Sequence, residues 1–214
     1  MQNENRKFFG KVMIINGSPH EKGTTSCALE EIEKALIQEG IEAETIFVGK
    51  ETARGCVACR ACRKLGKCVQ NDIVNDLADK LREADGLIIG SPVYYSSPNG
   101  TLLSILDRLF FSTSFDKRMK VGAAVVAARR GGTTASFDVL NKYFTISGMP
   151  VVSSSYWNQI HGSSYAEAQE DLEGLHTMRT LARNMAFLIK SIKLGIKEFS
   201  LPEAEPKTVT SFIR

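Results

Sequence analysis

Short apolar segments alternate with longer amphipathic segments along nearly the whole chain, and this alternation constrains the fold more than any other feature. The apolar segments are typical of buried strands, whereas the amphipathic ones place apolar residues three and four positions apart, as on one helix face. The pattern predicts strands at 11–16, 41–48, 87–89, 120–128 and 149–153, and helices at 24–38, 73–83, 100–111, 131–146 and about 166–193.

Strands that alternate with helices form a parallel sheet, because each parallel connection needs a crossover that covers a face of the sheet. We therefore predict an α/β three-layer sandwich, in which helices cover both faces of a five-stranded parallel sheet. A chain of 214 residues with 43% apolar content can bury one full core. We expect a single domain over 1–214, with a cysteine-rich loop at 54–70 and an irregular tail at 200–214.

The charge balance argues against some classes of partner. With 27 basic and 24 acidic residues spread along the chain, the net charge is only +3. That bias is too small to indicate binding to nucleic acid or to a membrane surface. The sequence also shows neither a membrane-spanning apolar run nor an apolar signal-peptide segment, so a cytoplasmic location is expected.

The loop after the first strand reads Gly-Ser-Pro-His-Glu-Lys-Gly-Thr-Thr-Ser, from Gly17 to Ser26, and leads directly into a predicted helix. The first backbone N–H groups of a helix are unpaired and the helix dipole is positive there, so such a loop favours a phosphate. It lacks the Lys-Ser or Lys-Thr of a P-loop and has no Gly-x-Gly-x-x-Gly. The alternative is that its hydroxyls only cap the helix.

Two further loops follow the third and fourth predicted strands. The first, Ser-Pro-Val-Tyr-Tyr-Ser-Ser-Pro from Ser91 to Pro98, offers tyrosine rings held between prolines. The second, Ala-Arg-Arg-Gly-Gly from Ala128 to Gly132, combines two cations with glycines. In open parallel sheets, ligands bind outside the carboxyl ends of the strands, where these loops are expected to meet.

The three loops together resemble those of the flavodoxin-like NAD(P)H-dependent FMN reductase family, and the resemblance covers the whole strand and helix alternation. It implies a flavodoxin-like fold with strand order 2-1-3-4-5, bound FMN, NAD(P)H as reductant, and a homodimer or homotetramer. The protein side chains would position the flavin rather than act as acid or base. The residues that the resemblance and the loops nominate for FMN binding are Ser18, His20, Gly23, Thr24, Thr25, Ser26, Pro92, Val93, Tyr94, Tyr95, Ser96, Ala128, Arg129, Arg130, Gly131 and Gly132.

Four of the five cysteines lie within one short loop, at Cys56, Cys59, Cys62 and Cys68. This spacing resembles the compact motif of the iron-sulfur flavoproteins, a branch of the same superfamily, and implies that these cysteines bind a [4Fe–4S] cluster. Nearby Arg and Lys residues would offset the negative charge of a cluster. Structural zinc and a set of metal-free thiols remain alternatives. The fifth cysteine, Cys27, is expected to be a small buried residue.

The function expected from these features is that of an FMN-dependent oxidoreductase that transfers electrons from NAD(P)H to a quinone, a flavin or another small acceptor, with the cluster as a further carrier. One alternative is an electron carrier reduced by ferredoxin, although the mildly basic chain differs from the strongly acidic flavodoxins. Another is a flavin-based redox sensor. Trp157 and His161, which follow the fifth predicted strand, are weaker candidates for the substrate side of the flavin.

Overall fold

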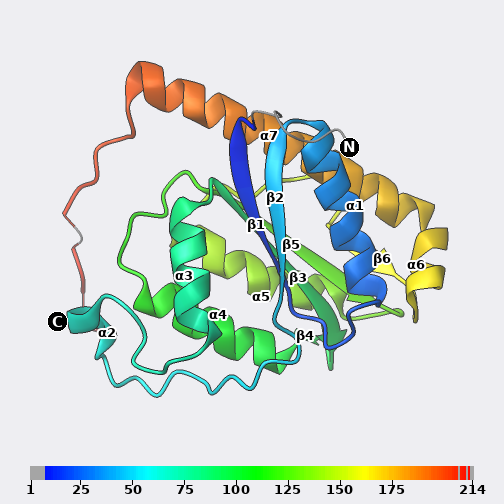
Figure 1. The fold of residues 1–214 in the computed structure, drawn as a ribbon, viewed down its shortest axis with the longest axis horizontal. Helices are drawn as coiled ribbons and strands as arrows, with labels where there is room; N and C mark the ends of the chain where they lie inside the picture. Colours follow the sequence, from blue (N-terminus) through cyan, green and yellow to red (C-terminus); the bar gives the residue numbers. More distant parts are fainter. Residues whose placement is uncertain (1–7, 207, 211, 213–214) are drawn as a thin grey trace, which may run out of the picture.

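The computed structural model describes residues 8–206, 208–210 and 212, and its helices and strands alternate as the sequence predicts (Figure 1). The main elements are β1 (Gly10–Asn16), α1 (Thr24–Gln38), β2 (Ile41–Phe47), α3 (Ile73–Glu83), β3 (Gly86–Tyr94), α4 (Gly100–Ser112), β5 (Val121–Ala128) and α5 (Thr133–Ile146). Shorter or later elements are α2 (Cys62–Leu65), β4 (Ser97–Pro98), β6 (Gln159–His161), α6 (Tyr165–Glu170) and α7 (Leu172–Phe199).

The strands form one sheet in the order β2-β1-β3-β5-β6, and all these neighbours are parallel. The sixth strand, β4, folds back from β3 as the antiparallel arm of a hairpin. When the parallel strands alone are counted, this is the predicted order 2-1-3-4-5. The carboxyl ends of β1 and β3 therefore lie side by side, at the position where the strand order reverses.

Each face of the sheet carries its own hydrophobic core, because successive residues of a strand point to opposite faces. Val12 and Ile14 of β1 pack with α1 and α7, whereas Met13 and Ile15 pack with α3 and α4. The helices thus cover both faces of the sheet (Figure 1). Within the described residues, no helix is both long and apolar enough to cross a membrane.

The fifth parallel strand differs from the prediction of 149–153. In that segment only Val151 forms a bridge to β5, where Gly122 N donates to Pro150 O at 2.8 Å and Val152 N donates to Gly122 O at 2.9 Å. The chain then leaves the edge and returns at Asn158, whose side chain donates to Ala124 O, before it forms β6. The edge strand is therefore split, and its second part, at 159–161, was missed because polar residues hide the strand pattern.

The last predicted helix, at about 166–193, is two helices, because Asp171 ends α6 and begins α7. One Asp171 oxygen accepts from Gly174 N at 2.9 Å and the other accepts from His161 N at 2.7 Å. An aspartate that caps a new helix in this way interrupts the previous one. Beyond α7, the described residues of the tail form neither helix nor strand.

Candidate functional site

The loops at the carboxyl ends of β1, β3, β5 and β6 meet around one cavity of about 420 Å³. This volume lies in the range of small-molecule sites. The position agrees with the rule that ligands of open parallel sheets bind at the switch point of strand order. The predicted residues that line the cavity are Ser18, His20, Gly23, Thr24, Thr25, Pro92, Val93, Tyr94, Ala128 and Arg129.

Helix α1 begins at this cavity without a side-chain cap. Its N-cap residue is Gly23, no side chain accepts a hydrogen bond from its first turn, and that turn contains no acidic residue. By contrast, α3, α4, α6 and α7 are capped by the side chains of Asp72, Asn99, Ser164 and Asp171. The start of α1 therefore presents its N–H groups and the positive end of its dipole to a ligand.

The hydroxyl groups of the β1–α1 loop shape the loop instead of capping the helix. Ser18 Oγ accepts from His20 N at 3.1 Å, and Ser26 Oγ accepts from Asn16 Nδ2 at 3.0 Å. The Asn16 oxygen in turn accepts from Ser18 N. These internal bonds hold the loop in one shape, and a loop that is already ordered loses less entropy when a ligand binds.

A tight hairpin forms the second wall of the cavity. Tyr94 pairs with Ser97, so Tyr95 and Ser96 are the two turn residues, with φ of 51° and 59°. Tyr94 lines the cavity, whereas the Tyr95 side chain stands fully in solvent. Gly132, with φ of 94°, packs so closely on this hairpin that a Cβ would lie 2.9 Å from Ser96 Cα. A glycine is therefore required where α5 begins.

The residues that line the cavity differ in part from the residues that the sequence predicted. Lys22, Ala127 and the segment 162–164 also line it, although they were not among the residues nominated for FMN binding. The Ser164-x-x-Glu167 pattern of a helix start could have revealed that segment: Ser164 caps α6, and Glu167 accepts from Ser163 N. The predicted residues that do not line the cavity are Ser26, Tyr95, Ser96, Arg130, Gly131 and Gly132.

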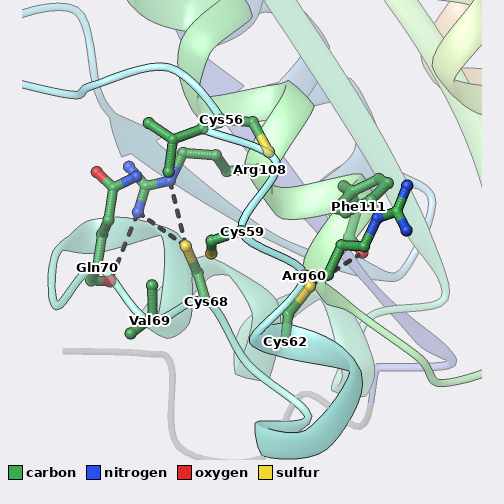
Figure 2. Close-up of a pocket in the computed structure, with 10 residues that line it drawn as sticks. Cys56, Cys59, Arg60, Cys62, Cys68, Val69, Gln70, Arg108 and Phe111 are labelled. Carbon is green, nitrogen blue, oxygen red and sulfur yellow. Dashed lines mark hydrogen bonds between the residues drawn. The ribbon is translucent and has the colours of Figure 1, made fainter.

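The four clustered cysteines line a second, smaller pocket of about 20 Å³ (Figure 2). Its other walls include Val57, Val69 and Phe111. Two of the cysteines, Cys56 and Cys59, are exposed, and the other two are half-buried. In the part of the chain that the structure describes, no three His, Cys, Asp or Glu side chains are gathered closely enough to hold a metal ion.

The backbone between these cysteines takes left-handed conformations that bring the side chains to one pocket. Ala58 has φ of 53° and Arg60 has φ of 58°, and Gly66 ends the single turn of α2 with φ of 68°. For residues with a Cβ, this conformation costs roughly 1–2 kcal/mol each. Such strain is concentrated at functional sites, where the surrounding structure maintains it.

A buried arginine lies against the pocket. Arg108 of α4 is 1% exposed, and its Nε and one terminal nitrogen each lie 3.3 Å from Cys68 Sγ. Its guanidinium pairs with Asp72 at 2.6 and 2.8 Å. These bonds raise the pKa of Arg108 and lower the pKa of Asp72. Sequence reasoning missed Arg108, although a charge within the apolar stripe of a helix was the available signal.

The donor set fits an iron-sulfur cluster: four thiols share one pocket with apolar walls, and a buried cation would offset the charge of their thiolates. The cavity as it stands has room for about one water molecule. The loop must therefore widen to hold a cluster, and the exposed cysteines Cys56 and Cys59 are the ones with space to move.

The strand order defines a flavodoxin-like α/β protein, and the uncapped start of α1 lies at its switch-point cavity. Residues 10–162 match the NADPH-dependent FMN reductase family. The chain belongs to the NADPH-dependent FMN reductase family.

Relatives of the chain agree with this assignment. An iron-sulfur flavoprotein of Methanocaldococcus jannaschii is 35% identical over 191 residues, which is 86% of this chain and 99% of the relative. Among solved structures, RosB with bound 8-demethyl-8-formylriboflavin-5'-phosphate is 17% identical, with a TM-score of 0.68 over 95% of this chain and 94% of that chain. An NAD(P)H:quinone oxidoreductase from Methanothermobacter marburgensis is also 17% identical, with a TM-score of 0.64 over 82% and 96%. At these identities the two structures bear on the fold alone.

Proposed function

We propose that this protein binds FMN in the cavity at the carboxyl ends of the strands and transfers electrons from NAD(P)H to a quinone, a flavin or another small acceptor. The observation that carries this proposal is the uncapped start of α1 at the cavity, with Gly23 as its N-cap. A phosphate placed there would accept hydrogen bonds from backbone N–H groups and would lie at the positive end of the helix dipole.

The remaining walls suit a flavin ring. The Pro92–Tyr94 segment offers backbone groups and a tyrosine ring, and exposed Arg129 offers a cation just beyond the neighbouring strand β5. Bound FMN would supply the electron-transfer chemistry, and the chain's own residues would bind it and orient it. A cation beside the ring would favour the negatively charged reduced form of the flavin.

We further propose that Cys56, Cys59, Cys62 and Cys68 hold a [4Fe–4S] cluster. Support comes from their shared pocket, from the cation of Arg108 beside Cys68, and from the name of the relative in Methanocaldococcus jannaschii. The cysteine sulfurs would be the ligands, and Arg108 would compensate part of their charge.

The FMN site is tested with Gly23→Asp and Gly23→Asn. Both substitutions add a capping acceptor at the start of α1, and neither needs a left-handed backbone, since φ at Gly23 is −119°. The aspartate also adds a negative charge where the phosphate is expected. Titration of the apoprotein with FMN should show affinity about 10- to 100-fold lower for Gly23→Asp, and a smaller loss for Gly23→Asn.

Two results would contradict the FMN proposal. One is a wild-type protein that binds no FMN in the titration. The other is a folded Gly23→Asp variant that binds FMN as tightly as the wild type. Steady oxidation of NAD(P)H by the FMN-loaded protein with a quinone acceptor then tests the reductase activity itself.

The second candidate is an electron carrier that ferredoxin reduces. The four-cysteine pocket favours this candidate, because an iron-sulfur cluster bound there would accept single electrons from ferredoxin. Rapid reduction by ferredoxin without any NAD(P)H oxidation would support the carrier. NAD(P)H oxidation with turnover of a quinone would support the reductase.

A further inference from the structure

The side chain of Arg108 contacts both ends of the cysteine loop, 54–70. One terminal nitrogen donates to Arg54 O at 3.2 Å, where the loop begins. The other donates to Gln70 O at 3.5 Å, where the loop ends, and Figure 2 shows the guanidinium between Gln70 and Cys68. A single side chain from α4 thus contacts both ends of the loop, which also touch directly where Gln70 Nε2 donates to Gly55 O at 3.4 Å.

The guanidinium is itself held in place. The two carboxylate oxygens of Asp72 each accept a hydrogen bond from one terminal nitrogen of Arg108. One of these oxygens also caps α3 by accepting from Val74 N. A planar guanidinium paired with a carboxylate through two bonds has a fixed orientation. Arg108 therefore presents its remaining N–H groups to Cys68, Arg54 and Gln70 in one defined geometry.

We propose that Arg108 is a positioning residue that clamps both ends of the cysteine loop and holds Cys68 ready to bind iron. The clamp itself stands on the hydrogen bonds described above, and its role in cluster binding rests on the proposed function. The segment between the clamped ends, which carries the exposed Cys56 and Cys59, would widen while Arg54 and Gln70 stay fixed.

The same helix links the two sites. Helix α4 begins at Asn99, whose side chain caps it and whose N–H donates to the Ser91 hydroxyl in the segment that forms the flavin cavity wall. Nine residues further along this helix, Arg108 reaches the cysteine loop. A rigid α4 would therefore hold the cysteine loop at a fixed position relative to the proposed flavin site.

Hydrogen bonds from a cation to a cluster ligand stabilise the more negative, reduced cluster and so raise its reduction potential. The N–H groups of Arg108 that point at Cys68 Sγ are placed for this role. Loss of the guanidinium is expected to lower the potential as well as to loosen the loop.

The clamp is tested first in the metal-free, FMN-loaded protein by hydrogen exchange of residues 54–70. Arg108→Gln should increase exchange in that loop about tenfold or more, because a buried charged network is lost, while exchange in α5 stays unchanged. Arg108→Lys keeps the charge without the planar fork and should give an intermediate result. The control is Asp107→Asn on the same helix, where the partner is Tyr143, and it should leave loop exchange unchanged.

Anaerobic reconstitution with iron and sulfide tests the second part. Wild type and Asp107→Asn should load equally, Arg108→Gln should bind several-fold less iron, and the cluster that forms should have a lower midpoint potential in an EPR-monitored titration. If Arg108→Gln does not fold, the same comparison is made with Arg108→Lys, which should show the same changes to a smaller extent.

The outcomes separate this inference from the proposed function. Unchanged loop exchange in the Arg108 variants would overturn the clamp, even if the wild type holds a cluster. Changed loop exchange in a wild-type protein that binds no iron would support the clamp and overturn the cluster. Equal iron content and equal potential in wild type and Arg108→Gln would overturn the role of Arg108 in cluster binding.

Discussion

Tyr95 and Ser96 show how single residues at this site depart from the local preferences of the chain. Both φ values are positive, and the two residues form a two-residue hairpin turn between β3 and β4. Turns of this type favour Asn-Gly, because residues with larger side chains are strained there. A tyrosine and a serine in these positions indicate a requirement other than stability.

Replacing the pair with Asn-Gly should stabilise the protein. The double substitution Tyr95→Asn with Ser96→Gly is expected to raise the free energy of unfolding by about 1 kcal/mol or more, because both strained residues are relieved. Urea denaturation of the FMN-free protein measures this. Equal or lower stability of the double variant would show that the turn is not strained as its φ values indicate.

Asp72 should make stability sensitive to acid. Its pKa is lowered in the folded protein, first by the hydrogen bond from Arg108 and also by Val74 N, against the opposing effect of burial. A lowered folded-state pKa means that the stabilisation is complete above the ordinary carboxyl value of about 4, and is lost as pH falls through the lowered value.

Asp72→Asn isolates the ion pair, because asparagine still caps α3. We expect the variant to lose about 2–3 kcal/mol at pH 7, where Arg108 is left without its counter-charge, and to lose less further stability between pH 4 and pH 2 than the wild type. Unfolding free energies measured across this range provide the check. If the unfolding free energies of the two proteins fell equally between pH 4 and pH 2, the result would contradict a lowered pKa of Asp72 in the folded protein.

At the scale of elements, the boundary between α6 and α7 depends on Asp171. Its two oxygens connect the start of α7 to His161 of β6, so one side chain both caps a helix and fixes it to the sheet edge beside the cavity. The sequence pattern, which predicts helix from about 166 to 193, contains apolar periodicity on both sides of Asp171 and gives no sign of the break.

Removal of this cap should cost stability. Asp171→Ala is expected to lower the free energy of unfolding by about 1–2 kcal/mol, because both N–H donors lose their acceptor. Asp171→Asn, which retains an oxygen acceptor, should lose less. Thermal and urea denaturation of the two variants beside the wild type provide the measurement, and equal stability of Asp171→Ala and wild type would contradict the capping role.

At the scale of the whole molecule, the proposed FMN site exists only when loops after several strands are assembled, so ligand binding should stabilise the folded chain. At an FMN concentration about 100 times the dissociation constant, the expected gain is about 2.7 kcal/mol, or about 5–10 °C in Tm. Riboflavin, which lacks the phosphate, should give a clearly smaller shift, because the start of α1 would have no anion to bind. Equal shifts with FMN and riboflavin would argue against a phosphate site at Gly23.

The sequence by itself determined the architecture and the broad position of the site. Buried strands such as Val12–Ile15 and the amphipathic helices between them leave few alternatives to a parallel sheet covered on both faces. The candidate phosphate loop that begins at Gly17 can be recognised from the sequence, because a helix start binds anions through its backbone and local sequence determines where a helix starts. The four cysteines can be recognised as a candidate cluster motif because they lie close together in the chain.

Only the tertiary structure decided which residues reach these sites from a distance. Arg108 meets the cysteine loop from a position 40 residues beyond Cys68, and the 162–164 segment meets the β1–α1 loop through Thr24, which is 138 residues before Gly162. Local sequence patterns describe only residues that are close in the chain. The buried Arg108 meets Asp72 because α3 and α4 pack together in the fold. For the same physical reason the sequence identified the cysteine loop, whereas only the fold showed that Arg108 contacts Cys68.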